Sequence, residues 1–353
     1  MNQITPQQRL LLLMHQGLKG DNGKTGLSLL RYRGSQVVAV VDADCAGENL
    51  TTLTGIPCAA PVVASVAEAL AYGPEVLVIG IAPSGGILPP AWRQEIRIGL
   101  QAGLCLVNGL HTPMAGDPEL AAALHPGAWI WDVRREPPGL QVGTAAAAQL
   151  NCRRVLTIGT DMSVGKMSTS LELHHLGLRQ GLRSAFVATG QTGIMIAGSG
   201  IPLDAVRLDY ASGAVEQAVV AAAQQADILH IEGQGSLFHP ASTATLPLLR
   251  GGQPTHLILV HRPGQTRVRT PQPRWLGAEI PPLQVVIQLY ESLAAASPSF
   301  TPARVVGIAL NTKHLDPEAA QQAIAQTRAQ TGLPCTDPIR FGAAPLLAAI
   351  LAH

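Results

Sequence analysis

Aromatic residues, charge of either sign and paired cysteines are all scarce in this chain of 353 residues. Phe, Trp and Tyr make up only 3% of it, too few for the aromatic platforms on which nucleic-acid bases stack. The 24 basic and 23 acidic residues leave a formal net charge of +1, so no broad electrostatic field attracts a polyanion. We therefore expect no nucleic acid and no membrane surface among its partners.

Long apolar runs and a cleavable leader are lacking as well. No apolar stretch approaches the roughly 18 residues that span a bilayer, and residues 1–10 have no charged region ahead of an apolar one. The five cysteines form no C-x-x-C pair, which is typical of reduced thiols. These features predict a soluble cytoplasmic protein, and they are compatible with a homo-oligomer without requiring one.

Short β-type runs alternate with helical patterns along the whole chain, which indicates parallel sheets covered by helices. The length suggests two domains, and the proline-rich stretch that begins at Pro137 marks the boundary. We predict one domain over residues 1–150 and a second over 151–353. The predicted strands are 10–15, 36–41, 76–81, 105–108, 129–133, 154–158, 184–188, 228–232, 256–260 and 304–310, and the predicted helices are 24–33, 65–72, 91–102, 118–124, 166–180, 213–225, 283–296 and 317–331.

The first domain contains a glycine-rich turn, Gly20 to Gly26, followed by a helical pattern and a strand that ends at Asp42. This order is superficially similar to a dinucleotide fingerprint with its ribose-binding acid. The glycine spacing is not G-x-G-x-x-G, however, so a tight strand-to-helix turn is the favoured interpretation.

A phosphate-binding loop is the strongest signal in the chain. An apolar strand from Val155 runs into a glycine-bounded loop that ends in Gly165-Lys166 and opens a helix. Backbone N–H groups in such a loop converge on an anion, and the lysine adds a mobile cation. The predicted phosphate- or nucleotide-binding residues are Gly159, Thr160, Asp161, Ser163, Val164, Gly165, Lys166, Met167 and Ser168.

The loop departs from G-x-x-x-x-G-K-[ST] in two places. Thr160 stands where the first glycine is usual, and Met167 stands where a hydroxyl normally holds Mg²⁺. Ser168 follows one residue later, about 100° further round the helix. The pattern therefore supports phosphate binding better than magnesium binding, with Glu232 and Ser168 as metal ligands only if the protein is Mg²⁺-dependent.

A second strand ends at Glu232, which is followed by Gly233 and Gln234, two predicted substrate-binding residues. Ligands collect outside the carboxyl ends of parallel strands, so we expect Glu232 near the phosphate loop. There it could hold a metal or take a proton from a nucleophile, or it could cap the next turn. His239, further along the same loop, is a candidate general base or a structural histidine bonded to a loop carbonyl.

Further polar residues follow other strands. Gln191 and Thr192 are placed to recognise a small polar substrate at the same edge, or to stabilise their own turn. Asp204 and Asp209 could hold a substrate amine, or they could be solvated acids at helix starts. Asn311 follows the strand 304–310, where related P-loop enzymes use an asparagine to read adenine.

Two resemblances refine this interpretation. Gly159-Thr-Asp161, Val164-Gly-Lys166 and Glu232-Gly233 resemble dethiobiotin synthetase and its amidoligase relatives, which activate a carboxylate or carbamate with ATP. Motifs over most of the chain resemble a two-domain P-loop family long described as of unknown function, whose members include D-glutamate N-acetyltransferases. These motifs are residues 79–82, 85–86, 89–92, 109–111, 190–193, 196–198, 204–206, 212–216 and 232–240.

The longer resemblance implies a Rossmann-like, doubly wound N-terminal domain followed by a P-loop NTPase-like parallel α/β domain. It also implies an N-acyltransferase that acts on a small acidic amino acid, with acetyl-CoA or ATP at the phosphate loop and Lys166, Glu232 and His239 as catalytic residues. Two alternatives stay open: an ATP–Mg²⁺-dependent ligase or kinase similar to dethiobiotin synthetase, and a nucleotide-binding regulatory module without turnover.

Overall fold

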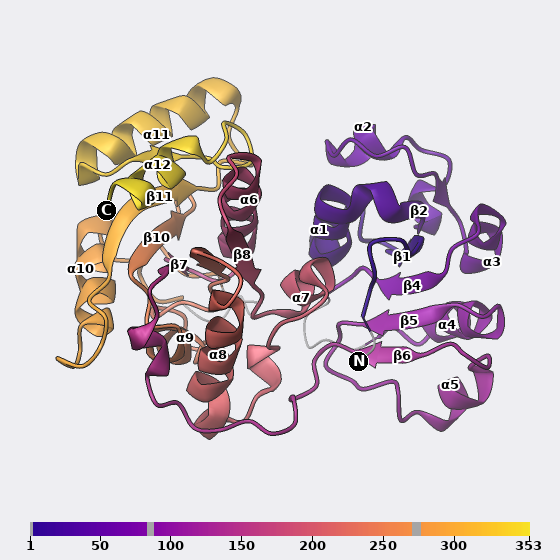
Figure 1. The fold of residues 1–353 in the computed structure, drawn as a ribbon. Helices are drawn as coiled ribbons and strands as arrows, with labels where there is room; N and C mark the ends of the chain where they lie inside the picture. The colour runs from indigo at the N-terminus through magenta and orange to yellow at the C-terminus, as the bar shows by residue number, and fades with distance from the viewer. Residues whose placement is uncertain (1–2, 83–87, 270–276) are drawn as a thin grey trace. The chain divides into compact units, whose positions relative to one another are not determined.

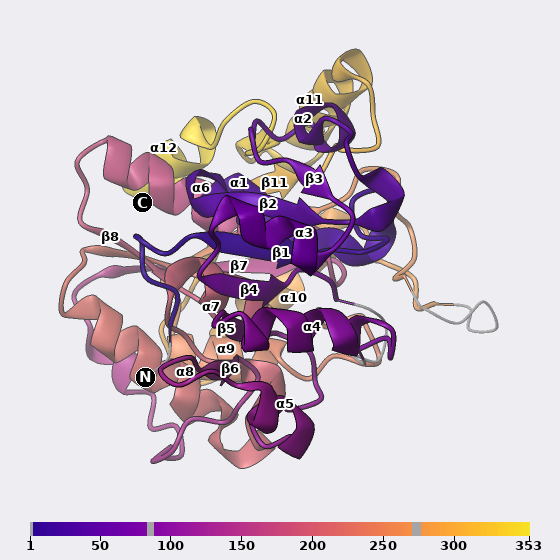
Figure 2. The ribbon, with the colours of Figure 1, turned by 90° about the vertical axis from the view of Figure 1, so that its right-hand side faces the viewer.

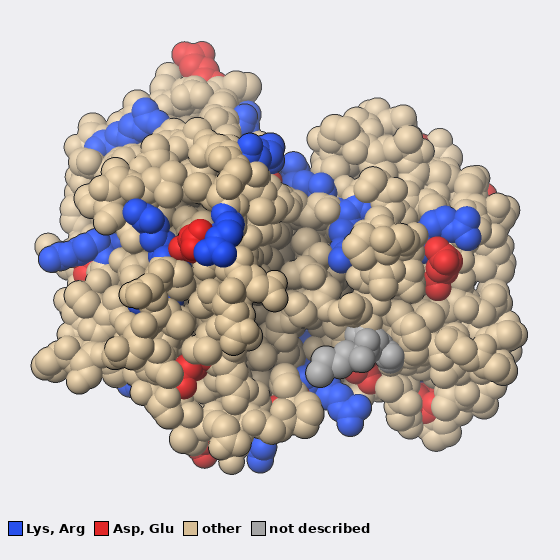
Figure 3. Space-filling view, in the orientation of Figure 1, with Lys and Arg blue, Asp and Glu red and all other residues tan. Residues whose placement is uncertain are grey.

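The computed structural model describes residues 3–82, 88–269 and 277–353, so Gly85 and Gly86 of the N-terminal motif lie outside the described residues. The chain forms two compact units, each built on one parallel sheet of six strands. In the described segments, no helix is both long and apolar enough to cross a membrane. On the face drawn in Figure 3, basic and acidic side chains are scattered among uncharged ones, as the small net charge leads one to expect.

The first unit comprises residues 1–135 together with residues 191–202. Its sheet has the order β3-β2-β1-β4-β5-β6, with every neighbouring pair parallel. Its elements are β1 (Leu10–Leu13), α1 (Lys24–Arg33), β2 (Val37–Val41), α2 (Leu50–Thr54), β3 (Val62–Val63), α3 (Val66–Ala69), β4 (Val76–Ile79), α4 (Trp92–Gln101), β5 (Cys105–Asn108), α5 (Pro118–Ala123), β6 (Ile130–Asp132) and α7 (Gln191–Ala197).

The second unit comprises residues 136–190 and 203–353, with the sheet order β12-β11-β10-β7-β9-β8, again parallel throughout. The strand that leads into the phosphate loop, β7, lies at the centre. The elements are β7 (Arg153–Gly159), α6 (Lys166–Arg179), β8 (Ser184–Val187), α8 (Leu208–Ala223), β9 (Ile228–Ile231), α9 (Thr245–Gly252), β10 (His256–His261), α10 (Leu283–Ala294), β11 (Arg304–Leu310), α11 (Pro317–Thr331), β12 (Cys335–Thr336) and α12 (Ala344–Ala352).

Alternating side chains of the strands pack against helices on the two faces of each sheet. In β7, Leu156 and Ile158 belong to a core shared with α8, α9 and α10, whereas Val155 belongs to a core shared with α6 and α12. In the first unit, Leu11 and Leu13 pack with α3, α4 and α5, and Figure 2 shows α3 and α4 in front of that sheet. The α/β architecture predicted from the alternating pattern is confirmed in both units.

The division of the chain differs from the expected boundary at residues 150/151. The change of unit falls after Arg135, and the segment with α7 returns to the first unit although it follows β8 in the chain. Figure 1 shows α7 beside α1, and five of its seven residues, Thr192 to Ile196, are buried. The sequence pattern did not reveal α7, because a short buried helix has no polar face to give it a helical period.

Candidate functional site: the phosphate loop and its acid

The loop between β7 and α6 exposes main-chain N–H groups to a ligand. Ser163 and Gly165 have φ values of 55° and 116°, which turn successive amides toward one concave side. No described residue accepts a hydrogen bond from the N–H groups of Ser163, Val164 or Gly165. The first N–H groups of α6, from Lys166 on, add further free donors and the positive end of the helix dipole. This arrangement is suited to an anion.

Lys166 lies across the loop. Its side chain is buried, and Nζ donates a hydrogen bond of 2.8 Å to the carbonyl oxygen of Asp161. Burial lowers the pKa of Lys166 to about 8, although the charges of Asp161 and Glu232 oppose that change. At neutral pH the ammonium is therefore still mostly charged, and a phosphate oxygen would be a stronger acceptor for it than a carbonyl.

Asp161 stabilises the loop, because both oxygens of its carboxylate accept hydrogen bonds from the protein. Its Oδ1 accepts from the N–H of Met162 (2.7 Å), and its Oδ2 accepts from Gln265 Nε2 (2.6 Å) and from the N–H of Arg269 (2.8 Å). Thr160 is also held by a hydrogen bond, since its hydroxyl lies 3.0 Å from Nδ1 of His261 at the end of β10. These two predicted ligand residues hold the shape of the loop.

Glu232 follows β9 and lies in the same buried region. Oε2 accepts from the N–H groups of Thr189 (2.9 Å) and Gly190 (3.1 Å), and Oε1 accepts from Gln234 Nε2 (3.1 Å). Burial raises the pKa of Glu232 to about 7, while these hydrogen bonds and Lys166 act in the opposite direction. The carboxyl group is therefore near half-protonation at neutral pH, which suits proton transfer.

Gly233 and Tyr290 join the acid to the loop. The N–H of Gly233 donates to the Thr157 hydroxyl on β7 (2.9 Å), and a Cβ at Gly233 would lie 1.7 Å from the Thr157 carbonyl oxygen. Tyr290 of α10 is fully buried and donates to the carbonyl oxygen of Gly159 (2.9 Å). Sequence reasoning missed Tyr290, because nothing in the pattern of α10 sets it apart from an ordinary core residue.

The donors at the loop fit phosphate better than Mg²⁺. Met167 supplies a thioether, which is not a ligand that Mg²⁺ prefers. Ser168 is half-buried, and the next hydroxyl that contacts the sheet, Ser170 Oγ, lies 3.0 Å from Thr157 Oγ1. In the parts of the chain that the structure describes, no three His, Cys, Asp or Glu side chains gather as a metal set.

His239 is held by the main chain at both ring nitrogens. The N–H of Ala241 donates to Nδ1 (3.2 Å), so Nδ1 carries no proton, and Nε2 lies 2.9 Å from the Arg269 carbonyl oxygen, to which it must donate. No lone pair of the ring is left for a substrate proton in this arrangement. The geometry favours the structural alternative for His239 over the general base.

Asn311 supports the loop. Its Nδ2 donates to the Val164 carbonyl oxygen (3.0 Å), and its Oδ1 accepts from the N–H of Lys313 (3.3 Å). Asp337 fixes this segment by accepting from the N–H and the hydroxyl of Thr312. The amide that was expected to read adenine is thus engaged in holding the phosphate loop.

Gln191 and Thr192 begin α7, which belongs to the first unit, and they follow Gly190, whose N–H donates to Glu232. Asp204 and Asp209 are exposed and lie in the first turns of helical segments that begin at Leu203 and Leu208. An acid in a first turn interacts favourably with the helix dipole. Their placement favours the alternative of solvated acids at helix starts.

Asp42 is a structural acid. It is fully buried, with Oδ1 accepting from the N–H of Gln16 (3.1 Å) and Oδ2 accepting from the N–H of Leu18 (3.2 Å). Both donors lie in the turn after β1. The side chain that the dinucleotide interpretation would assign to a ribose is thus engaged with the main chain, which favours the alternative of a tight strand-to-helix turn.

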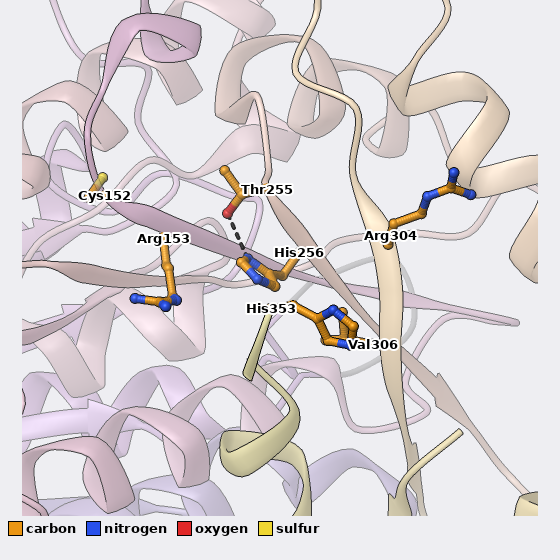
Figure 4. A pocket seen from close by; sticks show the side chains of 7 residues that line it. All are labelled: Cys152, Arg153, Thr255, His256, Arg304, Val306 and His353. Carbon is orange, nitrogen blue, oxygen red and sulfur yellow. Dashed lines mark hydrogen bonds between the residues drawn. The ribbon is translucent and has the colours of Figure 1, made fainter. Parts of the chain in front are cut away.

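A pocket of about 420 Å³ lies elsewhere on the second unit (Figure 4). Arg153, His256 and Arg304 line it, and these are the first residues of β7, β10 and β11. The phosphate loop follows the carboxyl end of β7, so this pocket lies at the opposite edge of the sheet and is not part of the site.

Together, the two sheets and the loop define a two-domain α/β protein with a P-loop domain. The chain belongs to the DUF1611 family: residues 141–347 match its P-loop domain and residues 43–136 match its Rossmann-like N-terminal domain, both described as domains of unknown function. A crystal structure of a DUF1611 family protein from Anabaena variabilis is 58% identical, with a TM-score of 0.94, covering 98% of this chain and 100% of that one.

Two relatives carry the name D-glutamate N-acetyltransferase. The protein from Tritonibacter scottomollicae is 36% identical over 336 residues, which are 93% of this chain and 94% of the relative. The protein from a Pseudoalteromonas species is 35% identical over 289 residues, which are 80% and 83% of the two chains.

Proposed function

We propose that this protein is an N-acetyltransferase that acts on an acidic amino acid and holds the phosphates of acetyl-CoA in the loop from Gly159 to Ser168. The similarity to two D-glutamate N-acetyltransferases over most of the chain supports the reaction. The observation that carries the phosphate assignment is the row of main-chain N–H groups at Ser163, Val164 and Gly165, which no described residue satisfies.

The chain's own groups suit this chemistry. Phosphate oxygens would accept from the loop amides and from Lys166. The amino group of the substrate must lose a proton before its nitrogen forms a bond to the acyl carbon. The C–S bond of the thioester then breaks, and coenzyme A leaves as the thiolate, which can take up the second proton of the amine. We assign the first proton to Glu232, because its pKa is raised to about 7. His239, with both ring nitrogens engaged, would hold the Glu232 loop in place.

A turnover assay read by mass spectrometry tests the proposal. D- and L-glutamate are each offered with acetyl-CoA, with and without chelator, and separately with ATP and Mg²⁺. We expect N-acetylglutamate from acetyl-CoA at an unchanged rate in chelator. A product that requires ATP and Mg²⁺ would favour the ligase or kinase instead, and nucleotide binding without any turnover would favour the regulatory module.

Single-residue variants test the role that each residue of the site is given. Lys166→Ala should weaken coenzyme A binding by about 1.5 to 3 kcal/mol, the range for a hydrogen bond to a charged group, while the exposed Lys19→Ala should leave it unchanged. Glu232→Gln should lower kcat by about 10²-fold or more. If a folded His239→Ala variant shows that loss and Glu232→Gln does not, the base is His239 after all.

A further inference from the structure

Four segments of the first unit meet at the carboxyl edge of its sheet: the start of α1, the turns after β5 and β6, and the start of α7. The hydroxyl of Thr25 lies 3.1 Å from that of Thr192. Arg134 Nε donates to the Gly109 carbonyl oxygen (2.7 Å), and a Cβ at Gly109 would lie 3.3 Å from Cγ of Gln191. Arg134 and Gln191 therefore both lie beside Gly109. Thr25 and Thr192, which follow Lys24 and Gln191 in the chain, contact each other.

Basic side chains gather at this meeting point. Lys24 and His111 are exposed and Arg134 is half-buried, so all three can be reached from solvent. Although both residues reach solvent, the protein atoms around their charged groups displace part of the water and lower the pKa of Lys24 and of His111, and the positive charge of Arg134 lowers both further. Groups that repel one another in this way lie close together, and a bound anion would favour their charged forms.

We propose that Lys24, His111, Arg134 and Gln191 bind the carboxylate groups of the acidic amino acid substrate on the first unit. This inference rests on the proposed function for the identity of the ligand. An arginine fork matches the planar, two-oxygen geometry of a carboxylate, and a lysine adds a point charge. The Gln191 amide offers both a donor and an acceptor for the remaining polar groups of an amino acid.

The chemistry here differs from that of the phosphate loop. The amides of the turn after β1 are already engaged, since Gln16 and Leu18 donate to Asp42 and Gly17 donates to the Met14 carbonyl oxygen. Recognition at this edge therefore depends on side chains placed at separate points. Such an arrangement suits a small molecule with two carboxylate groups better than a phosphate, which main-chain amides would surround.

Calorimetry on the full chain tests the site, with D-glutamate, L-glutamate, D-glutamine and inorganic phosphate as separate probes and no acyl donor present. We expect Lys24→Met and His111→Ala each to weaken binding of the preferred glutamate by about 10- to 100-fold. The matched controls Lys19→Met and His125→Ala should bind as the wild type does. In turnover assays, KM for glutamate should rise while KM for acetyl-CoA stays constant.

The outcomes separate the two proposals. Loss of glutamate binding in Lys24→Met supports the site even if no acetyl transfer is found, which would overturn only the proposed function. Unchanged glutamate affinity in folded Lys24→Met and His111→Ala overturns the site. Binding of phosphate that depends on Lys24, with no binding of either glutamate, also overturns it and reassigns the edge to a phosphate group.

Discussion

Each unit uses a buried carboxylate at the end of a strand to hold two main-chain N–H groups, but the two acids hold different segments. Asp42, after β2, binds the turn that follows the central strand β1. Glu232, after β9, binds Thr189 and Gly190, which follow the edge strand β8. The acid of the first unit thus accepts from main-chain donors in the turn after its central strand.

The two units also differ in which main-chain N–H groups lack a described acceptor. In the second unit, Glu232 accepts from another segment, and the N–H groups of Ser163 to Gly165 in the loop after β7 have no described acceptor. Two sheets of similar architecture therefore differ in which segment their buried carboxylate holds.

Gly233→Ala should have the largest effect, because it forces the Glu232 loop away from β7. The new Cβ would lie 1.7 Å from the Thr157 carbonyl oxygen, and backbone on both sides cannot yield easily. We expect the free energy of unfolding to fall by about 3 kcal/mol or more, with loss of coenzyme A binding. Gly34→Ala is the control, since nothing lies within 4 Å of its Cβ. Denaturant titration measures both, and equal small losses would show that the close contact is relaxed at little cost.

Asp42→Asn and Glu232→Gln compare the two acids directly. Asn at position 42 can accept from only one of its two donors through its carbonyl, so unfolding should become easier by about 1.5 to 3 kcal/mol, with phosphate binding intact. Glu232→Gln should cost less stability, because a carboxyl group whose pKa is raised to about 7 already carries its charge at a disadvantage. If the free energy of unfolding falls equally in both variants, the charge of Glu232 contributes as much to stability as that of Asp42, contrary to this prediction.

Acid should destabilise the second unit through its buried histidines. The pKa of His230 is lowered to about 3 by burial and by His174, and in the described structure neither ring nitrogen has a partner. The unfolded chain binds a proton below about pH 6.5 while the folded chain does not, so stability falls as pH drops from 6.5 toward 4, by up to about 1.4 kcal/mol per pH unit. Between the usual pKa of a glutamate and pH 7, the folded chain binds a proton at Glu232 and the unfolded chain does not. The contribution of Glu232 to the free energy of unfolding therefore rises as the pH falls through this range.

The variant His230→Leu isolates this contribution. Its free energy of unfolding should depend less steeply on pH than that of the wild type, and its stability at pH 5 should be higher. His125→Leu, at an exposed site of the first unit, should keep the wild-type slope. If the two variants titrate alike, His230 does not stay neutral in the folded state.

The regular elements could be predicted from the sequence where apolar periodicity is strong. The ranges 24–33, 105–108, 304–310 and 317–331 were predicted at the residues where α1, β5, β11 and α11 are found. The strands β3 and β12 have two residues each, too few for a period to register. The phosphate loop was found from its glycines and lysine, because that chemistry requires particular residues at fixed spacing.

The partners of the site residues could not be predicted, because they depend on contacts between distant segments. Asn311 was expected to face a nucleotide, yet its amide bonds to Val164, 147 positions away. His239 was a candidate base until the carbonyl of Arg269 and the N–H of Ala241 were found at its two nitrogens. A sequence shows which side chains can do chemistry, and only the fold shows which of them are already engaged.

The return of residues 191–202 to the first unit has a consequence for how such a protein can evolve. A fragment cut after Arg135 would lack α7, and the apolar side chains of Ile194 and Met195 would no longer be supplied to that unit. Neither unit is a continuous stretch of sequence, so no single cut in the chain yields both units whole. Exchange of either unit for that of a homologue would require more than one junction.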